Sequence, residues 1–117
     1  MAKLFHLGTC STCRRLLGEL DPPPHVEQID IKKTHVTPED LDRMAALAGG
    51  YAPLFNRRAR KYQSAGLAER ELTEDDYRRL ILEEYTFLKR PVVLTDSAVY
   101  AGSAKATVAA ARADLHS

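Results

Sequence analysis

The sequence predicts an α/β fold in which helices pack on a four-stranded mixed sheet. Apolar patterns run strand–helix–strand near the N-terminus and strand–strand–helix near the C-terminus, and a block of helical patterns separates the two. The 117 residues include 44% hydrophobic and 28% charged residues with a net charge of +1, which is typical of one soluble domain. We therefore expect a single domain over residues 1–117, with a helical insertion at about 37–85.

The N-terminal pattern is that of a βαβ unit. Residues 3–7 are predicted to form a strand, and residues 11–20 a helix, because apolar residues recur at i, i+3, i+4 and i+7. These apolar positions are Cys13, Leu16, Leu17 and Leu20. Ser11 is the expected N-cap, and the three prolines after Asp21 end the helix. Residues 26–31 then predict a second strand, parallel to the first.

Two helix starts mark the insertion. Thr37 precedes Pro38, which is typical of an N-cap followed by proline at the first helical position. The apolar positions of this helix are Leu41, Met44, Ala45 and Ala48. Thr73 is the second expected N-cap, with Asp76 at the capping-box position. The stripe expected to be buried in that helix comprises Tyr77, Leu80, Ile81 and Tyr85.

The C-terminal third predicts a hairpin followed by a helix. Residues 92–94 form a short apolar strand led by Pro91, and residues 99–101 form its partner across a tight turn. An alanine-rich helix is expected over residues 103–115. The order β-α-β, helical insertion, β-β-α is the thioredoxin-like plan.

The chemistry is expected at Cys10 and Cys13, which form a C-x-x-C pair where the first strand leads into the first helix. A helix N-terminus has free N–H groups and partial positive charge, so a thiolate there is stabilised and its pKa falls. Arg14 and Arg15 add positive charge. We expect an exposed, attacking Cys10 and a shielded, resolving Cys13.

Two other interpretations of this pair remain open. The cysteines are either half of a zinc site or two inert core thiols. Zinc needs two further ligands, and the chain has no second C-x-x-C. The four histidines are not spaced as a ligand pair, and His6, within the first strand, is more typical of a packed residue than of a catalytic base. No bound metal is expected.

A basic cluster lies within the insertion: Arg57, Arg58, Arg60 and Lys61. Such a charge run is usually a solvated face. In the alternative interpretation, one or two of these arginines bind an anion beside the cysteine loop, because the guanidinium matches oxyanion geometry.

The remaining composition excludes several classes of protein. A net charge of +1 gives no basis for bulk attraction to nucleic acid or membranes. No apolar run approaches the roughly 18 residues that span a bilayer, and the N-terminus lacks a signal-peptide pattern. We expect a cytoplasmic protein, in which a C-x-x-C disulfide is transient.

Four segments resemble the ArsC/Spx family of glutaredoxin-type arsenate reductases and their thiol-redox relatives. They are His6-x-x-x-Cys10-x-x-Cys13-Arg14, residues 62–67, residues 72–75 and residues 88–95. The resemblance extends over nearly the whole chain. It implies a thioredoxin-like fold and a cis peptide bond before Pro91, which brings the preceding backbone beside the cysteine loop.

The resemblance also implies roles for individual residues. Cys10 matches the catalytic cysteine and Arg90 matches an oxyanion-binding arginine. Asn56 stands at another of the family's arginine positions, with Arg57 and Arg58 next along the chain. The expected site therefore comprises catalytic Cys10 and Cys13 and substrate-binding Arg14, Arg57, Arg58, Arg90 and Pro91.

Two functions follow from the resemblance. The first is a thiol-dependent oxidoreductase that takes a small oxyanion or a disulfide, binds no cofactor and is reduced by glutathione, glutaredoxin or thioredoxin. The second is an Spx-like redox-sensing regulator in which the cysteine pair is a disulfide switch and the partner is RNA polymerase.

Overall fold

The computed structural model describes residues 2–117 and divides the chain into two compact units. Among the described residues, unit 1 comprises residues 2–35 and 90–117, and unit 2 comprises residues 36–89. The chain passes from one unit to the other twice, after His35 and before Arg90. The helical block expected at about 37–85 lies within unit 2.

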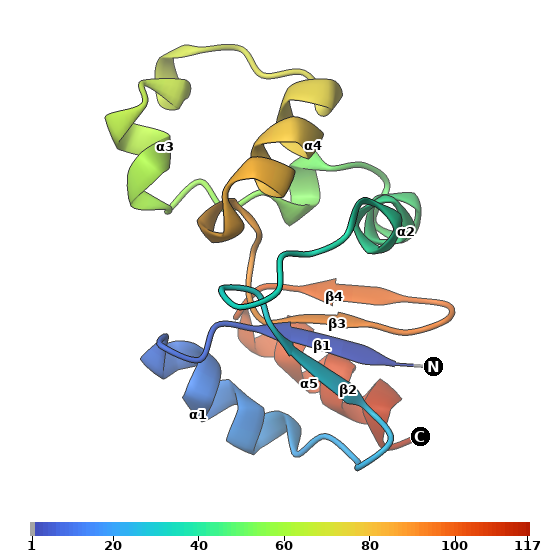
Figure 1. Ribbon diagram of the computed structural model, residues 1–117. Helices are drawn as coiled ribbons and strands as arrows, with labels where there is room; N and C mark the ends of the chain where they lie inside the picture. Colours follow the sequence, from blue (N-terminus) through green and yellow to red (C-terminus); the bar gives the residue numbers. More distant parts are fainter. Residues whose placement is uncertain (1) are drawn as a thin grey trace. The chain divides into compact units, whose positions relative to one another are not determined.

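Unit 1 contains the predicted mixed sheet, in the order β2-β1-β3-β4 (Figure 1). The strands are β1 (Lys3–His6), β2 (Glu27–Asp30), β3 (Val92–Leu94) and β4 (Val99–Ala101). β1 runs parallel to β2 and antiparallel to β3, and β4 pairs antiparallel with β3. This confirms the thioredoxin-like fold class, in which the central strands β1 and β3 come from opposite ends of the chain.

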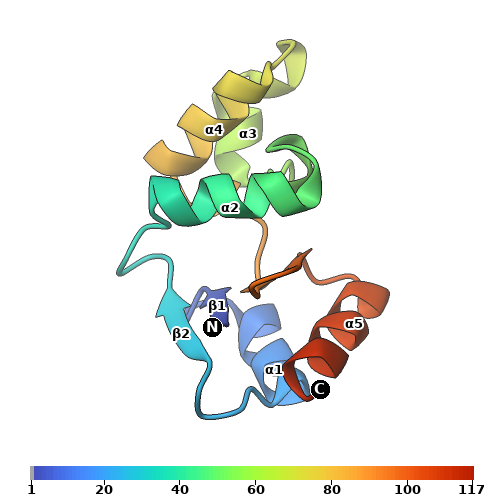
Figure 2. The ribbon, with the colours of Figure 1, turned by 90° about the vertical axis from the view of Figure 1, so that its right-hand side faces the viewer.

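Helices α1 (Ser11–Leu20) and α5 (Lys105–Leu115) lie side by side on one face of this sheet (Figures 1 and 2). Leu4 and Val93 are directly paired across β1 and β3, and both belong to the apolar core that also contains Leu16 and Leu20 of α1. Burying each such side chain stabilises the fold by about 1.5–3 kcal/mol. The core thereby fixes α1 against the strand that precedes it.

The C-terminal end of α1 is held by side chains of the last helical segment. Arg112 Nε donates to the carbonyl of Glu19 (3.0 Å), and His116 Nε2 is 3.0 Å from the carbonyl of Leu20. The last carbonyls of a helix have no partners within the helix, so these contacts satisfy them from outside. The C-terminal end of α1 is therefore anchored within unit 1.

Unit 2 is helical (Figure 2). Its elements are α2 (Pro38–Ala48), η1 (Ala52–Leu54), α3 (Arg60–Ser64), η2 (Leu67–Glu69), α4 (Glu74–Glu83) and η3 (Tyr85–Phe87). Phe55 is at its centre, with ring centroids 5.1 Å from Phe87, 5.0 Å from Tyr77 and 5.7 Å from Tyr62. These rings join α3, α4 and η3 around one buried aromatic side chain.

Both predicted N-caps of unit 2 are confirmed. Thr37 Oγ1 accepts from the N–H of Asp40 (3.1 Å). Thr73 and Asp76 form the reciprocal capping box, with distances of 3.2 Å and 3.0 Å. These side chains satisfy donors that the first helical turn leaves free, which explains why α2 and α4 begin where the sequence indicates.

Some predicted boundaries differ from the structure by one or two residues. β1 ends at His6 rather than residue 7, β2 spans 27–30 rather than 26–31, and α5 begins at Lys105 rather than residue 103. Gly102, with φ of 102°, and Ala104, in an extended conformation, delay the start of α5. Of the four positions predicted to form the buried stripe of one helix, Ile81 is buried, and Tyr77 and Leu80 are half-buried in α4. Tyr85 is half-buried in η3, because α4 ends at Glu83.

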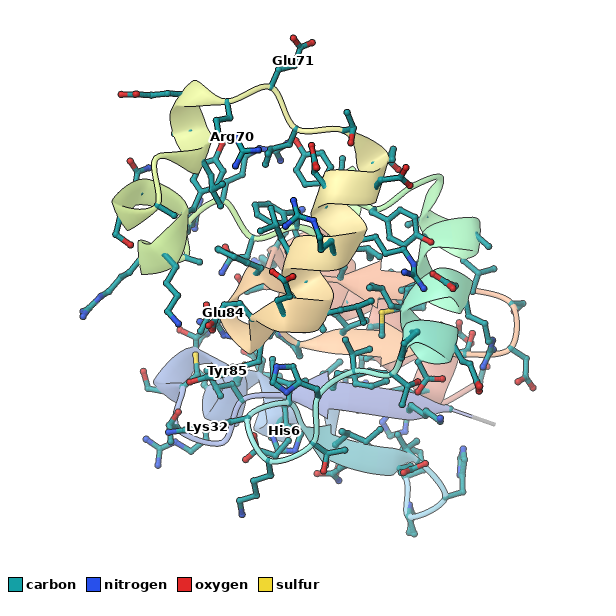
Figure 3. All side chains as sticks on the ribbon, turned by 45° about the horizontal axis from the view of Figure 1, so that its top comes forward. His6, Lys32, Arg70, Glu71, Glu84 and Tyr85 are labelled. Carbon is teal, nitrogen blue, oxygen red and sulfur yellow. The ribbon has the colours of Figure 1, made fainter. Side chains whose placement is uncertain are left out.

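The capping box of α4 yields a stability prediction. Replacing Thr73 with alanine removes the acceptor for the Asp76 N–H and should lower the free energy of unfolding by about 1 kcal/mol. Urea denaturation followed by circular dichroism measures the change. Glu71→Ala is the matched control, because Glu71 is exposed and lies on the outer segment between η2 and α4 (Figure 3). Equal losses in the two variants would contradict the capping role.

Candidate active site

A tight turn carries Cys10 from β1 into α1. The Cys10 N–H donates to the carbonyl of Leu7 (3.0 Å), and the Cys10 carbonyl accepts the first helical hydrogen bond, from Arg14 N–H (3.1 Å). Cys10 has the extended conformation of an N-cap (φ −90°, ψ 119°), and Ser11 is the first helical residue. The expectation that Ser11 caps the helix is therefore wrong: the cap position belongs to the nucleophile candidate itself.

This position favours ionisation of Cys10. The neutral thiol forms no side-chain cap hydrogen bond. Burial raises the pKa of Cys10, but hydrogen bonds to the thiolate from the Cys13 N–H, the Cys13 thiol, the Thr12 N–H and the Arg90 side chain outweigh it. The pKa of Cys10 therefore lies below its ordinary value. Because the sulfur is only partly buried, the thiolate is accessible to a reactant.

Cys13 is the opposite case. It lies within the first turn of α1, as predicted, and it is 0% exposed. Burial, together with the charge of Cys10 and the hydrogen bond donated to it, raises the pKa of Cys13 to about 11, although the Leu7 backbone and the Arg90 charge oppose the rise. The pair thus consists of an activated, accessible thiol and a protonated, shielded one that donates to it.

Arg90 comes to the site from the other end of the chain. It precedes Pro91 across a cis peptide bond, which the family resemblance implied. Pro91 is buried and leads directly into β3, which pairs with β1. The Arg90 side chain is one of the groups that lower the pKa of Cys10. Unit 1 therefore brings Cys10, Cys13, Arg90 and Pro91 together.

The other predicted arginines are placed differently. Arg14 lies exposed on the first turn of α1. Arg57 and Arg58 belong to unit 2, where the Arg57 guanidinium donates to Tyr77 Oη (2.8 Å) and lies 5.4 Å from the centre of its ring. Arg58 is exposed. A role for these two arginines toward Cys10 stays a prediction.

Asn56 has a structural role within unit 2. Its side-chain amide donates to the carbonyl of Thr86 (3.2 Å), and its oxygen accepts from the N–H of Arg58 (3.1 Å). In the rest of the basic cluster, Lys61 forms an ion pair with Glu84 at the end of α4 (Figure 3). Asn56, next to Arg57, and Lys61, in the same basic cluster, therefore both have partners within unit 2.

The sequence predicts that free N–H groups at the start of this helix stabilise the thiolate, but it does not identify which main-chain groups do so. The Thr12 and Cys13 N–H groups and the Leu7 backbone affect the two thiols, yet main-chain groups carry no signal in residue type. The spacing of the cysteines locates these groups only once Cys10 is known to be the N-cap. His6 contributes no hydrogen bond through Nδ1, which is buried without a partner among residues 2–117.

Neither a metal site nor a membrane span is found in the described part of the chain. Among residues 2–117, no three His, Cys, Asp or Glu side chains are grouped so that they could hold a metal ion. None of the helices described there has the length and apolarity to cross a membrane.

Comparisons with known proteins agree with this architecture. The chain is similar to the arsenate reductase from Vibrio cholerae (20% identity, TM-score 0.77, covering 93% of this chain and 95% of that one). It is similar to a possible arsenate reductase from Streptococcus mutans (25% identity, TM-score 0.67, covering 85% of this chain and 87% of that one). It is also similar to an arsenate reductase (ArsC) related protein from Brucella melitensis (22% identity, TM-score 0.67, covering 93% of this chain and 92% of that one). A comparison with curated protein sequences gave no match. The ArsC family model matches residues 5–111, and the chain therefore belongs to the ArsC family.

Proposed function

We propose that this protein is a thiol oxidoreductase in which Cys10 is the nucleophile and Cys13 resolves the intermediate. The single observation that carries the proposal is the asymmetry of the pair: the pKa of Cys10 is lowered and that of Cys13 is raised to about 11, within one helical turn. An attacking group must be ionised and accessible, whereas a resolving group must be near but not compete for the substrate. Membership of the ArsC family supports the same chemistry.

The proposed first step is attack by the Cys10 thiolate. On arsenate, its sulfur forms a bond to arsenic, the bond from arsenic to one hydroxyl oxygen breaks, and that hydroxyl takes up a proton from solvent and leaves as water. On a mixed disulfide, the Cys10 sulfur forms a bond to one sulfur, and the other leaves as a thiolate. Arg90, beside Cys10, offsets the negative charge of an oxyanion, and the start of α1 contributes partial positive charge.

The second step is resolution by Cys13. Its thiol loses a proton, and its sulfur attacks Cys10 Sγ, forming the Cys10–Cys13 disulfide. In the arsenate case the As–S bond breaks and its electron pair stays on arsenic, which is reduced from As(V) to As(III). In the disulfide case the bound thiolate leaves. An external thiol, from glutathione, glutaredoxin or thioredoxin, then reduces the disulfide by exchange.

An Spx-like redox switch is the second candidate function. The observation that favours it is the C-x-x-C pair itself, because the same disulfide can report oxidation rather than complete a catalytic cycle. The oxidised and reduced chains would then differ in affinity for RNA polymerase. A pull-down with the two forms separates the functions: retention of polymerase subunits by one form alone favours the switch.

Trapping of the intermediate tests the division of roles. Cys13→Ser keeps the nucleophile but removes the resolving sulfur, so it should accumulate a mixed disulfide at Cys10 when treated with oxidised glutathione. Cys10→Ser should form no adduct and have no activity. Intact-protein mass spectrometry measures the adducts. If neither variant were trapped and both were inactive, Cys13 would not be the resolving residue.

The pH dependence of alkylation tests the role of Arg90. Arg90→Ala removes a hydrogen bond to the Cys10 thiolate, so the pKa of Cys10 should rise, and iodoacetamide should react about three- to tenfold more slowly at pH 7. The measurement is made in the Cys13→Ser background, where only Cys10 can react. Arg60→Ala is the matched control, because Arg60 is exposed on α3. Equal shifts in the two variants would exclude a specific role for Arg90.

Protection by substrate tests the oxyanion proposal. Arsenate bound beside Arg90 should slow alkylation of Cys10 at constant pH, whereas sodium chloride at the same ionic strength should not. Arg90→Ala should lose the protection, and Arg58→Ala shows whether the basic cluster of unit 2 contributes. A low pKa of Cys10 without protection by arsenate would direct the proposal to disulfide substrates.

A further inference from the structure

We propose that Asp30 is a positioning residue for Cys10, acting through a steric contact between its carboxylate and Gly8. The inference rests on the proposed function, in which Cys10 is the nucleophile. Asp30 is the last residue of β2, and Gly8 lies in the turn that carries Cys10 from β1 to α1. Nothing in the chemistry proposed above uses Asp30, which makes this contact a separate feature of the site.

The Asp30 carboxylate occupies the space beside Gly8. A Cβ atom built on Gly8 would lie 2.7 Å from Asp30 Oδ2 and 3.7 Å from its Cγ, and the first distance is shorter than a Cβ contact tolerates. The φ angle of Gly8 is outside the left-handed region that favours glycine. The backbone conformation therefore admits other residues at this position, but a side chain there would have to displace the Asp30 carboxylate.

Asp30 is held in place by its own strand and turn. It is paired in register with His6 of β1, and the ladder continues with a hydrogen bond from Ile31 N–H to the His6 carbonyl (2.9 Å). Asp30 Oδ1 accepts from the N–H of Lys32 (3.0 Å), and the Asp30 carbonyl accepts from Thr34 N–H (2.9 Å). The carboxylate that meets Gly8 is thus fixed at its other oxygen.

This arrangement transmits the position of β2 to the nucleophile. The turn spans only Leu7 to Cys10 and is closed by one hydrogen bond. A displacement at Gly8 therefore moves Cys10 relative to the Thr12 and Cys13 N–H groups that stabilise its thiolate. The side chain of Lys32, beside Asp30, is exposed (Figure 3). The group that meets a Cβ on Gly8 is the Asp30 carboxylate.

The role is steric rather than electrostatic. A negative charge near a thiolate disfavours its ionisation, so an effect of the Asp30 charge alone would make removal of that charge lower the pKa of Cys10. A supporting contact has the opposite consequence: loss of the side chain loosens the turn and raises the pKa of Cys10. Asp30→Asn keeps the shape of the side chain and removes its charge, which separates the two roles.

The experiment is a double-mutant cycle with the rate and pH profile of Cys10 alkylation as readouts, all in the Cys13→Ser background. Gly8→Ala should slow alkylation at pH 7 by about tenfold when Asp30 is present, and by less than about twofold in the Asp30→Ala background. Asp30→Ala alone should shift the profile to higher pH, and Asp30→Asn should restore it. Gly18→Ala is the control, because no atom lies within 4 Å of a Cβ at this exposed position of α1.

Three results would overturn the proposal. They are a Gly8→Ala variant that reacts like Gly18→Ala, equal effects of Gly8→Ala in the two backgrounds, and an Asp30→Ala profile that coincides with the parent profile. The last comparison is informative even if Gly8→Ala does not fold. A parent profile with an ordinary thiol pKa would instead contradict the proposed function, so the two failures are distinguishable.

Discussion

The backbone N–H groups at the start of α1 have no carbonyl partners within the helix, and Cys10 occupies the cap position where a side chain accepts from them. A neutral thiol accepts hydrogen bonds weakly, whereas a thiolate accepts them strongly, so the site distinguishes the two states of one sulfur. The apolar core beneath α1 and the contacts at its C-terminal end serve this arrangement, because they hold the helix against β1. The lowered pKa of Cys10 is therefore a consequence of where the helix begins.

The same helix gives the second cysteine its different character. Cys13 is one turn further along, on the face that packs into the protein, so burial keeps its thiol protonated while geometry keeps it near Cys10. A protonated Cys13 donates to the Cys10 thiolate and becomes a nucleophile only after losing that proton. The proton on Cys13 therefore affects both cysteines: it stabilises the Cys10 thiolate by hydrogen bonding, and it must leave before Cys13 can attack. In the proposed mechanism, this coupling would favour the thiolate of Cys10 in the free protein and would delay disulfide formation until Cys10 carries a substrate and has lost its charge.

The elements of this fold were predictable wherever a local pattern specified them. Thr37 and Thr73 cap helices because their own side chains do so, and the apolar spacing of Cys13 and Leu16 defines the buried face of α1. Ser11 was misassigned because hydroxyl side chains are the usual caps, and the sequence does not show that the extended residue is Cys10. The contact of Asp30 with Gly8 was also hidden, since it depends on the register of two strands more than twenty residues apart.

The residues of the proposed mechanism are divided between the two units: the cysteines and Arg90 belong to unit 1, and Arg57 and Arg58 belong to unit 2. Cys10, Cys13 and Arg90 all belong to unit 1, so thiol–disulfide exchange, which needs an activated thiolate and a resolving thiol, requires nothing further. Reduction of an oxyanion requires more, because its charge must be neutralised while the thiolate approaches. Arg57, a candidate for that task, already donates to Tyr77 within unit 2, and Asn56 stands where the family resemblance implies an arginine. Of the two proposed reactions, disulfide exchange therefore needs the smaller set of residues. Oxyanion reduction would depend on how many arginines contact the bound oxyanion.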